Sequence, residues 1–182
     1  MDASGLLLTY RDYAALPDDG RRYELHDGAL SVTPAPGTRH QRISRELSAA
    51  LHQHVKAHGL GEVLIAPLDV ILSEVTVLQP DLVYVDPTRA HLVSERGVEG
   101  PPTLVVEIIS PYTGTIDRVT KSFLYARHEV PYFWLVDPKA RAVEAFRLEG
   151  GRYVLVTRAA GDAEVVLPPF TGLTLRLADL WA

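Results

Sequence analysis

The sequence contains no cysteine among its 182 residues. This absence excludes disulfide bonds, thiolate zinc sites and cysteine nucleophiles, and it predicts a cytoplasmic protein. No apolar run is long enough to span a bilayer. The first residues, Met1 to Leu8, lack the basic and apolar regions of a signal peptide. We therefore expect neither a membrane protein nor a secreted one.

Positive charge is also scarce. The chain has 18 Lys and Arg against 23 Asp and Glu, which gives a formal net charge of −5. A non-catalytic DNA-binding domain usually carries a basic surface, so the bulk charge argues against that class. An enzyme acting on nucleic acid is not excluded, because carboxylates clustered at a metal site lower the net charge while the bound cation supplies positive charge locally.

The remaining sequence predicts one mixed α/β domain over residues 1–182. Apolar residues recur at steps of three and four between Thr38 and His58, which is typical of an amphipathic helix. Asp27-Gly28 separates two short alternating runs and predicts a β-hairpin. We expect further helices at 10–16 and 115–128, strands at 62–66, 68–72, 82–85, 103–109 and 131–136, a hairpin at 142–157, and a short strand with a helical turn in the tail. In the 115–128 helix, the side chains predicted to point inward are Val119, Phe123, Leu124 and Tyr125.

Glu107 interrupts the apolar run from Thr103 to Ile109, which is typical of a central strand covered on both faces. A buried carboxylate is costly unless a metal or a base pairs with it, or unless it is protonated. A functional role and a structural ion pair, with Lys121 or Arg118, are both compatible with this position.

Asp81 follows Pro80 at the start of a predicted strand. A strand-start aspartate is common, but a second carboxylate beside Glu107 could bind Mg²⁺ or Mn²⁺, which prefer oxygen ligands. A metal-bound water and a nearby lysine are the groups that phosphodiester hydrolysis requires. Lys121 is the nearest candidate lysine, although a surface ion pair with Asp117, four residues earlier, explains it equally well.

Asp69 is a further candidate metal ligand. If residues 68–72 pair antiparallel with 82–85, Asp69 lies opposite Asp81, and two opposed acids repel unless a cation lies between them. A solvent-facing edge aspartate is the alternative. The seven histidines form no zinc motif; His54 and His58 share a helix face, but no third ligand is evident.

A series of sequence blocks in fixed order resembles the Uma family of restriction endonucleases, part of the PD-(D/E)XK, or restriction-endonuclease-like, superfamily. The blocks cover nearly the whole chain. They are Tyr23-Glu24-Leu25-x-Asp27-Gly28, Pro36 with His40, Asp69-Val70, Gln79-Pro80-Asp81-Leu82, Leu104 to Pro111, Asp117-x-x-x-Lys121 and Tyr132 to Pro138.

The resemblance implies a restriction-endonuclease-like core, with a central mixed β-sheet flanked by helices, and Mg²⁺ or Mn²⁺ at the site. Asp81 and Glu107 match the acids of the superfamily, and Glu24 matches an N-terminal acid that can complete the metal site. Ile109 occupies the usual lysine position, and Lys121 matches a lysine moved to the next helix. His40 matches a recurrent histidine that could contact phosphate at a helix N-terminus, with a capping or surface histidine as the alternative.

The sequence thus favours a divalent-metal-dependent endonuclease that hydrolyses DNA, with Asp81, Glu107 and Lys121 as catalytic residues. A non-enzymatic module that kept the fold is the alternative, because the net charge is acidic and Ile109 replaces the lysine. Hydrolysis of a small phosphate ester is a third possibility. A homodimer is expected, since symmetric dimers are the commonest oligomers. Phe170, Leu173 and Trp181 could be buried either at such a contact or in the core.

Overall fold

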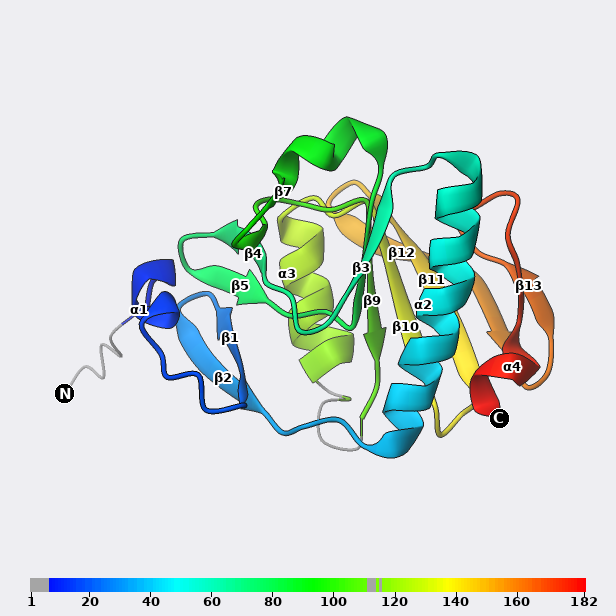
Figure 1. The fold of residues 1–182 in the computed structure, drawn as a ribbon, viewed down its shortest axis with the longest axis horizontal. Coiled ribbons are helices and arrows are strands. Elements are labelled where there is room, and N and C mark those ends of the chain that lie inside the picture. Colours follow the sequence, from blue (N-terminus) through cyan, green and yellow to red (C-terminus); the bar gives the residue numbers. More distant parts are fainter. Residues whose placement is uncertain (1–6, 111–113, 115) are drawn as a thin grey trace.

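The computed structural model describes residues 7–110, 114 and 116–182 (Figure 1). Its fold is mixed α/β and contains two six-stranded sheets. The first sheet has the order β2-β1-β5-β4-β8-β7. Its strands are β1 (Arg22–His26), β2 (Ala29–Thr33), β4 (Val70–Ser73), β5 (Thr76–Leu78), β7 (Val93–Ser94) and β8 (Gly97–Val98).

The second sheet has the order β12-β11-β10-β9-β6-β3, and β9 and β10 are its parallel pair. Its strands are β3 (Glu62–Ile65), β6 (Leu82–Val85), β9 (Leu104–Ile108), β10 (Tyr132–Asp137), β11 (Ala142–Glu149) and β12 (Arg152–Ala160). A small third sheet pairs β13 (Glu164–Val166) with β14 (Thr174–Arg176). The helical segments are α1 (Tyr10–Ala14), α2 (Thr38–His58), η1 (Pro87–Leu92), η2 (Ile116–Lys121), α3 (Ser122–Arg127) and α4 (Leu177–Trp181).

Strand β9 is buried along its whole length, as its apolar sequence predicts. Its side chains alternate between two apolar clusters: Val106 packs with α2, whereas Val105 packs with α3. The two helices therefore cover opposite faces of the second sheet (Figure 1). Helix α2 presents the predicted stripe of Ile43, Leu47, Leu51 and Val55 to that sheet.

The tail closes the α2 side of the core. Phe170 is 3% exposed and stacks edge-on against Trp134 of β10. Leu173 and Trp181 pack against the same cluster. The core interpretation of these three residues is thus supported within the chain. None of the described helices is long and apolar enough to cross a membrane.

Two expectations about local structure were wrong. Val119 and Phe123 are each 62% exposed, whereas Leu124 and Tyr125 are buried as predicted. The reason is that the expected single helix is split: η2 is π-helical up to Lys121, which shifts the helical period before α3 begins. The start of that predicted helix, Thr115, lies outside the described residues.

Candidate active site at the junction of two sheets

Asp81 lies where the chain passes from one sheet to the other. β5 ends at Leu78 in the first sheet, and β6 begins at Leu82 in the second. The register of β6 with β9 ends at the pair of Leu82 and Val106, and the backbone N–H of Asp81 donates to the Val106 carbonyl at 3.0 Å. The Asp81 carboxylate accepts from the backbone N–H of Ile108, the residue after Glu107. The two predicted acids therefore lie at the same end of β9.

The Asp81 carboxylate has a different environment at each oxygen. Its Oδ2 accepts hydrogen bonds from the Ile108 backbone N–H at 2.8 Å and from His40 Nε2 at 3.0 Å. Its Oδ1 lies 3.3 Å from the guanidinium of Arg22. Burial by itself would raise the pKa of Asp81, but the His40 hydrogen bond and the Arg22 charge lower it overall. Asp81 is therefore held as an anion.

Glu107 is 2% exposed, and its carboxylate is bound by groups from the helical segment that follows β9. The ammonium of Lys121 donates to Oε1 and Oε2 at 3.1 and 3.2 Å, and the hydroxyl of Tyr125 donates to Oε1 at 2.6 Å. Lys121 is itself 4% exposed. The lysine predicted from the sequence thus meets the predicted acid, although it comes from a helix rather than from the strand.

Glu24 reaches the same lysine from β1. Its Oε1 lies 2.9 Å from Lys121 Nζ and accepts a hydrogen bond from the Gln79 backbone N–H at 2.7 Å. Burial alone would raise the pKa of Glu24, but the Lys121 ammonium and the hydrogen bonds, including one from His26, lower it to about 2. Lys121 therefore joins Glu24 and Glu107, the acids of two different sheets.

Sequence reasoning missed two residues of this group, Arg22 and Tyr125. The sequence pattern could have identified both of them. Alternation along β1 places Arg22 on the same face as Glu24, and Tyr125 lies one helical turn beyond Lys121. Burial alone would lower the pKa of Arg22, but the negative charges of Asp81, Glu107 and Glu24 raise it. The negative charges of all three acids thus act on the guanidinium of Arg22.

The expected position of Asp69 was wrong. β4 pairs with β5 and β8 rather than with β6, so Asp69 is not opposite Asp81. Its Oδ1 instead accepts hydrogen bonds from the Tyr13 hydroxyl at 2.7 Å and from Gln79 Nε2 at 2.8 Å. The reason is that the chain turns back between Ser73 and Thr76 to form β5, a strand too short to be identified by periodicity.

Two further expectations concern the segment after β9. Ile109 packs against the apolar cluster on the α3 side of the sheet, so it supplies no charge to the site. The side chain of Asp117 lies outside the described residues, and its predicted pairing with Lys121 stays a prediction.

A cavity of about 650 Å³ adjoins His40. It lies at the N-terminus of α2, where Gly37 caps the helix without a side-chain hydrogen bond and the first turn contains no acid. Its lining includes two cationic side chains, Arg39 and Lys139, together with Ser110 and Asp137. Uncapped backbone N–H groups at a helix N-terminus attract anions, and the two cations reinforce that field.

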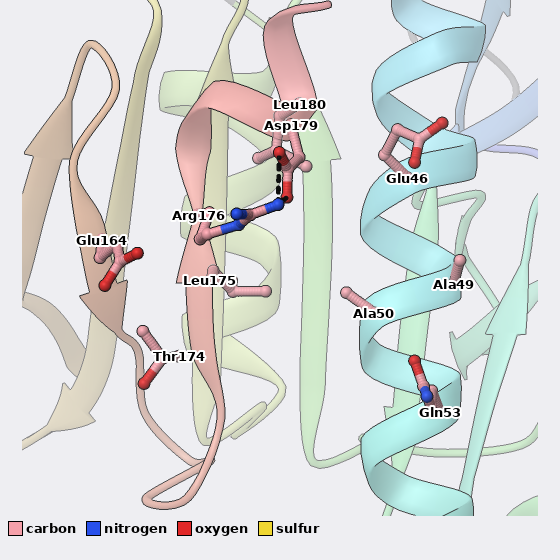
Figure 2. Close-up of a pocket in the computed structure, with 10 residues that line it drawn as sticks. All are labelled: Glu46, Ala49, Ala50, Gln53, Glu164, Thr174, Leu175, Arg176, Asp179 and Leu180. Carbon is pink, nitrogen blue, oxygen red and sulfur yellow. Dashed lines mark hydrogen bonds and ion pairs between the residues drawn. The ribbon is translucent and has the colours of Figure 1, made fainter.

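A second groove, of about 580 Å³, runs between α2 and the β14–α4 segment (Figure 2). It contains three carboxylates, those of Glu46, Glu164 and Asp179. Its Arg176 is paired with Asp179 at 2.9 Å. The excess of negative charge makes this groove unsuitable for a polyanion.

Among the residues that the structure describes, no three His, Asp or Glu side chains are grouped so that they could hold a metal ion by themselves. The rings of His54 and His58 lie 4.4 Å apart on α2, where His58 Nδ1 contacts the His54 carbonyl.

Comparisons with known proteins identify the family and the fold of this chain. No curated protein matches the sequence significantly. A crystal structure described as a "putative nuclease belonging to DUF820", from Anabaena variabilis, is 21% identical, and the match covers 96% of this chain and 97% of that chain with a TM-score of 0.78. At this identity the likeness establishes the fold. The Uma2 family model, described as "Putative restriction endonuclease", matches residues 10–178, and the chain therefore belongs to the Uma2 family.

Proposed function

We propose that the protein is a divalent-metal-dependent endonuclease that hydrolyses phosphodiester bonds in DNA. The observation that carries this proposal is that Asp81 and Glu107 are both buried at the same end of β9, with the Asp81 carboxylate on the Ile108 N–H and the buried Lys121 bound to Glu107. Two carboxylates and a lysine in this relation suit metal-assisted hydrolysis. Membership of the Uma2 family supports the same reaction class.

The donor set fits Mg²⁺ or Mn²⁺. Both cations prefer oxygen ligands, and Mg²⁺ in particular is commonly bound by one or two carboxylates while it keeps several waters. We assign Asp81 Oδ1 and the Glu107 carboxylate as the ligands. When bound, the metal would supply an activated water and would neutralise charge on the phosphate oxygens.

The protein's own groups prepare these ligands. The Ile108 N–H and His40 fix Oδ2 of Asp81, which leaves Oδ1 on the side of Arg22. Lys121 and Tyr125 orient the carboxylate of Glu107. Lys121 would also stabilise the negative charge that develops on the phosphate during hydrolysis.

Glu24 and Asp69 were predicted as additional ligands, and their contacts favour other roles. Glu24 binds Lys121 and keeps it close to Glu107. Asp69 binds Tyr13 and Gln79. We therefore propose that Glu24 acts on the site through the lysine.

The cavity at the start of α2 is the proposed entrance for the DNA backbone. His40 joins it to the acids, because His40 lines the cavity and also binds Asp81. Arg39 and Lys139 place two positive charges beside this connection. We thus retain His40 as a nucleic-acid-binding residue, and the local positive charge compensates for the acidic net charge of the chain. A homodimer stays a prediction.

A non-enzymatic module is the second candidate, and one observation favours it: the buried acids already have cationic partners in the chain. Lys121 binds Glu24 and Glu107, and Arg22 binds Asp81. Such pairs can be purely structural. Calorimetry with MnCl₂ distinguishes the two candidates, since a structural network has no vacancy for the ion and should release no binding heat.

Glu107→Gln tests the proposed enzyme directly. The change removes a ligand charge but keeps the size of the side chain, so the fold should survive. We expect nicking of supercoiled plasmid with Mn²⁺ or Mg²⁺ to fall by about 100-fold or more. Glu46→Gln, which alters a partly exposed glutamate on α2, is the matched control and should cleave at the wild-type rate. If the wild-type protein cleaves neither plasmid DNA nor RNA with any divalent ion, the enzyme proposal is wrong.

A further inference from the structure

Arg22 is the residue of the site whose role is still undefined. It comes from β1, and its side chain is 17% exposed. Its guanidinium donates to Asp81 Oδ1 at 3.3 Å and to the backbone carbonyl of Gln79. It therefore lies on the Asp81 oxygen that we assign to the metal.

The two oxygens of Asp81 differ in how easily their partners can be exchanged. The partners of Oδ2 are the backbone N–H of Ile108, which is fixed by β9, and the ring of His40 on α2. The partner of Oδ1 is a long, unbranched side chain at the far end of the hydrogen-bonding range. An incoming cation could displace Arg22 from Oδ1 by side-chain rotation, without moving a strand.

The donors of Arg22 are only partly used in this arrangement. Its Nε is buried and has no hydrogen-bond partner among the described residues. An unsatisfied buried donor is destabilising, so the guanidinium is not in an optimal position. A guanidinium binds best when two of its N–H groups meet two oxygens of one planar or tetrahedral anion, such as a phosphate.

The balance of charges in the site also indicates that Arg22 would leave Asp81 when a metal binds. Asp81, Glu107 and Glu24 contribute three negative charges, and Arg22 and Lys121 contribute two positive charges. A divalent cation bound between Asp81 and Glu107 would reverse the sign of this sum. It would also lie close to the guanidinium, and two cations on one carboxylate repel each other.

We propose that Arg22 is the counter-ion of Asp81 in the metal-free protein, that a divalent metal displaces it from Oδ1, and that the released guanidinium then binds a phosphodiester oxygen of the substrate. This inference rests on the proposed function and adds a substrate-binding residue to it. Arg22 thus competes with the metal and cooperates with the nucleic acid, so removal of its charge should change the two affinities in opposite directions.

Arg22→Gln tests the competition with the metal. Glutamine is neutral but keeps an N–H donor for the Gln79 carbonyl. In calorimetry with MnCl₂ and no DNA, we expect this variant to bind Mn²⁺ about tenfold more tightly than the wild type, because a repelling charge has been removed from a partly buried site. Arg22→Lys keeps the charge and should stay within about twofold of the wild type. Arg21→Gln, at an exposed arginine next in the chain, should leave the affinity unchanged.

DNA binding tests the second half of the proposal. Fluorescence anisotropy of a labelled duplex, with Ca²⁺ as the metal, should show about tenfold weaker binding for Arg22→Gln despite its tighter metal binding. Arg22→Lys should also bind DNA more weakly than the wild type, because lysine lacks the fork of N–H donors. If Arg22→Gln does not fold, as judged by circular dichroism, Arg22→Lys decides the question through this second measurement.

The outcomes separate this inference from the proposed function. If the wild type binds Mn²⁺ and cleaves DNA but Arg22→Gln binds Mn²⁺ no more tightly, the inference is wrong and the nuclease proposal stands. If Mn²⁺ binding appears only when Arg22 is replaced, Arg22 blocks the site in the wild type, and both the proposed displacement by metal and the nuclease proposal are wrong. If neither protein binds Mn²⁺, both proposals are wrong.

Discussion

Replacing Lys121 by Met should destabilise the metal-free protein strongly, because it leaves two buried carboxylates without their shared cation. Lys121 lies 2.9 Å from Glu24 and 3.1 Å from Glu107, and its side chain is 5% exposed. Breaking a buried ion pair by removing one partner typically costs about 3–5 kcal/mol. Methionine fills a similar volume, so the loss reflects charge rather than a cavity. The free energy of unfolding at pH 7 should fall by that amount in urea titrations.

The pH dependence of the free energy of unfolding should also change sign in the Lys121→Met variant. In the wild type, the pKa of Glu24 is lowered from 4.5 to about 2. A lowered pKa contributes stability that is fully present above pH 4.5 and is lost as the pH falls toward 2, in total about 3 kcal/mol. Without Lys121, only the hydrogen bonds from His26 and the Gln79 N–H oppose burial, which is the largest cause acting on the group, so we expect the pKa of Glu24 to rise. The variant should therefore become more stable as the pH is lowered from 7 to 5, whereas the wild type should not.

Urea titrations at pH 7 and pH 5 provide the assay, with equal m-values as the check that both proteins unfold in the same way. Lys56→Met is the matched control, because Lys56 is exposed on α2. It should change the free energy of unfolding by less than about 1 kcal/mol. The reasoning is refuted if Lys121→Met loses no more stability than this control, or if its stability falls between pH 7 and pH 5.

Two further substitutions test the structure around the site. Tyr125→Phe removes the hydroxyl that donates to Glu107 and should lower the free energy of unfolding by about 2 kcal/mol. The control Tyr23→Phe, at an exposed hydroxyl, should lower it by less than about 1 kcal/mol. Equal losses of the two variants in urea titrations would contradict the hydrogen bond assigned to Tyr125. Gly61→Ala should destabilise by about 3 kcal/mol or more, since its φ is +106° and a Cβ would lie 2.1 Å from a backbone carbonyl of β6. Gly59→Ala, where φ is +61° and nothing lies within 4 Å, should cost about 1 kcal/mol in the same thermal or urea measurements.

Much of the fold follows from local sequence patterns. The stripe of α2, the hairpin at Asp27-Gly28 and the apolar run of β9 each appear where periodicity and turn chemistry predict them. Strands of two or three residues, such as β5 and β8, carry too few residues for a period to be detected. The pairing partner of β4 was consequently misjudged, and with it the position of Asp69.

The sequence by itself determined which acids are exceptional. A carboxylate in the most apolar strand must have a partner, because its burial is otherwise too costly, and this reasoning identified Glu107. The need for a second acid and a nearby lysine then pointed to Asp81 and Lys121, and the family resemblance added Glu24. Which partner each acid has was decided only by the tertiary structure. Residues 22, 81, 107 and 121 are brought together by strand pairing across two sheets and by a π-helical turn. Such contacts depend on register and helical phase, which local periodicity does not specify.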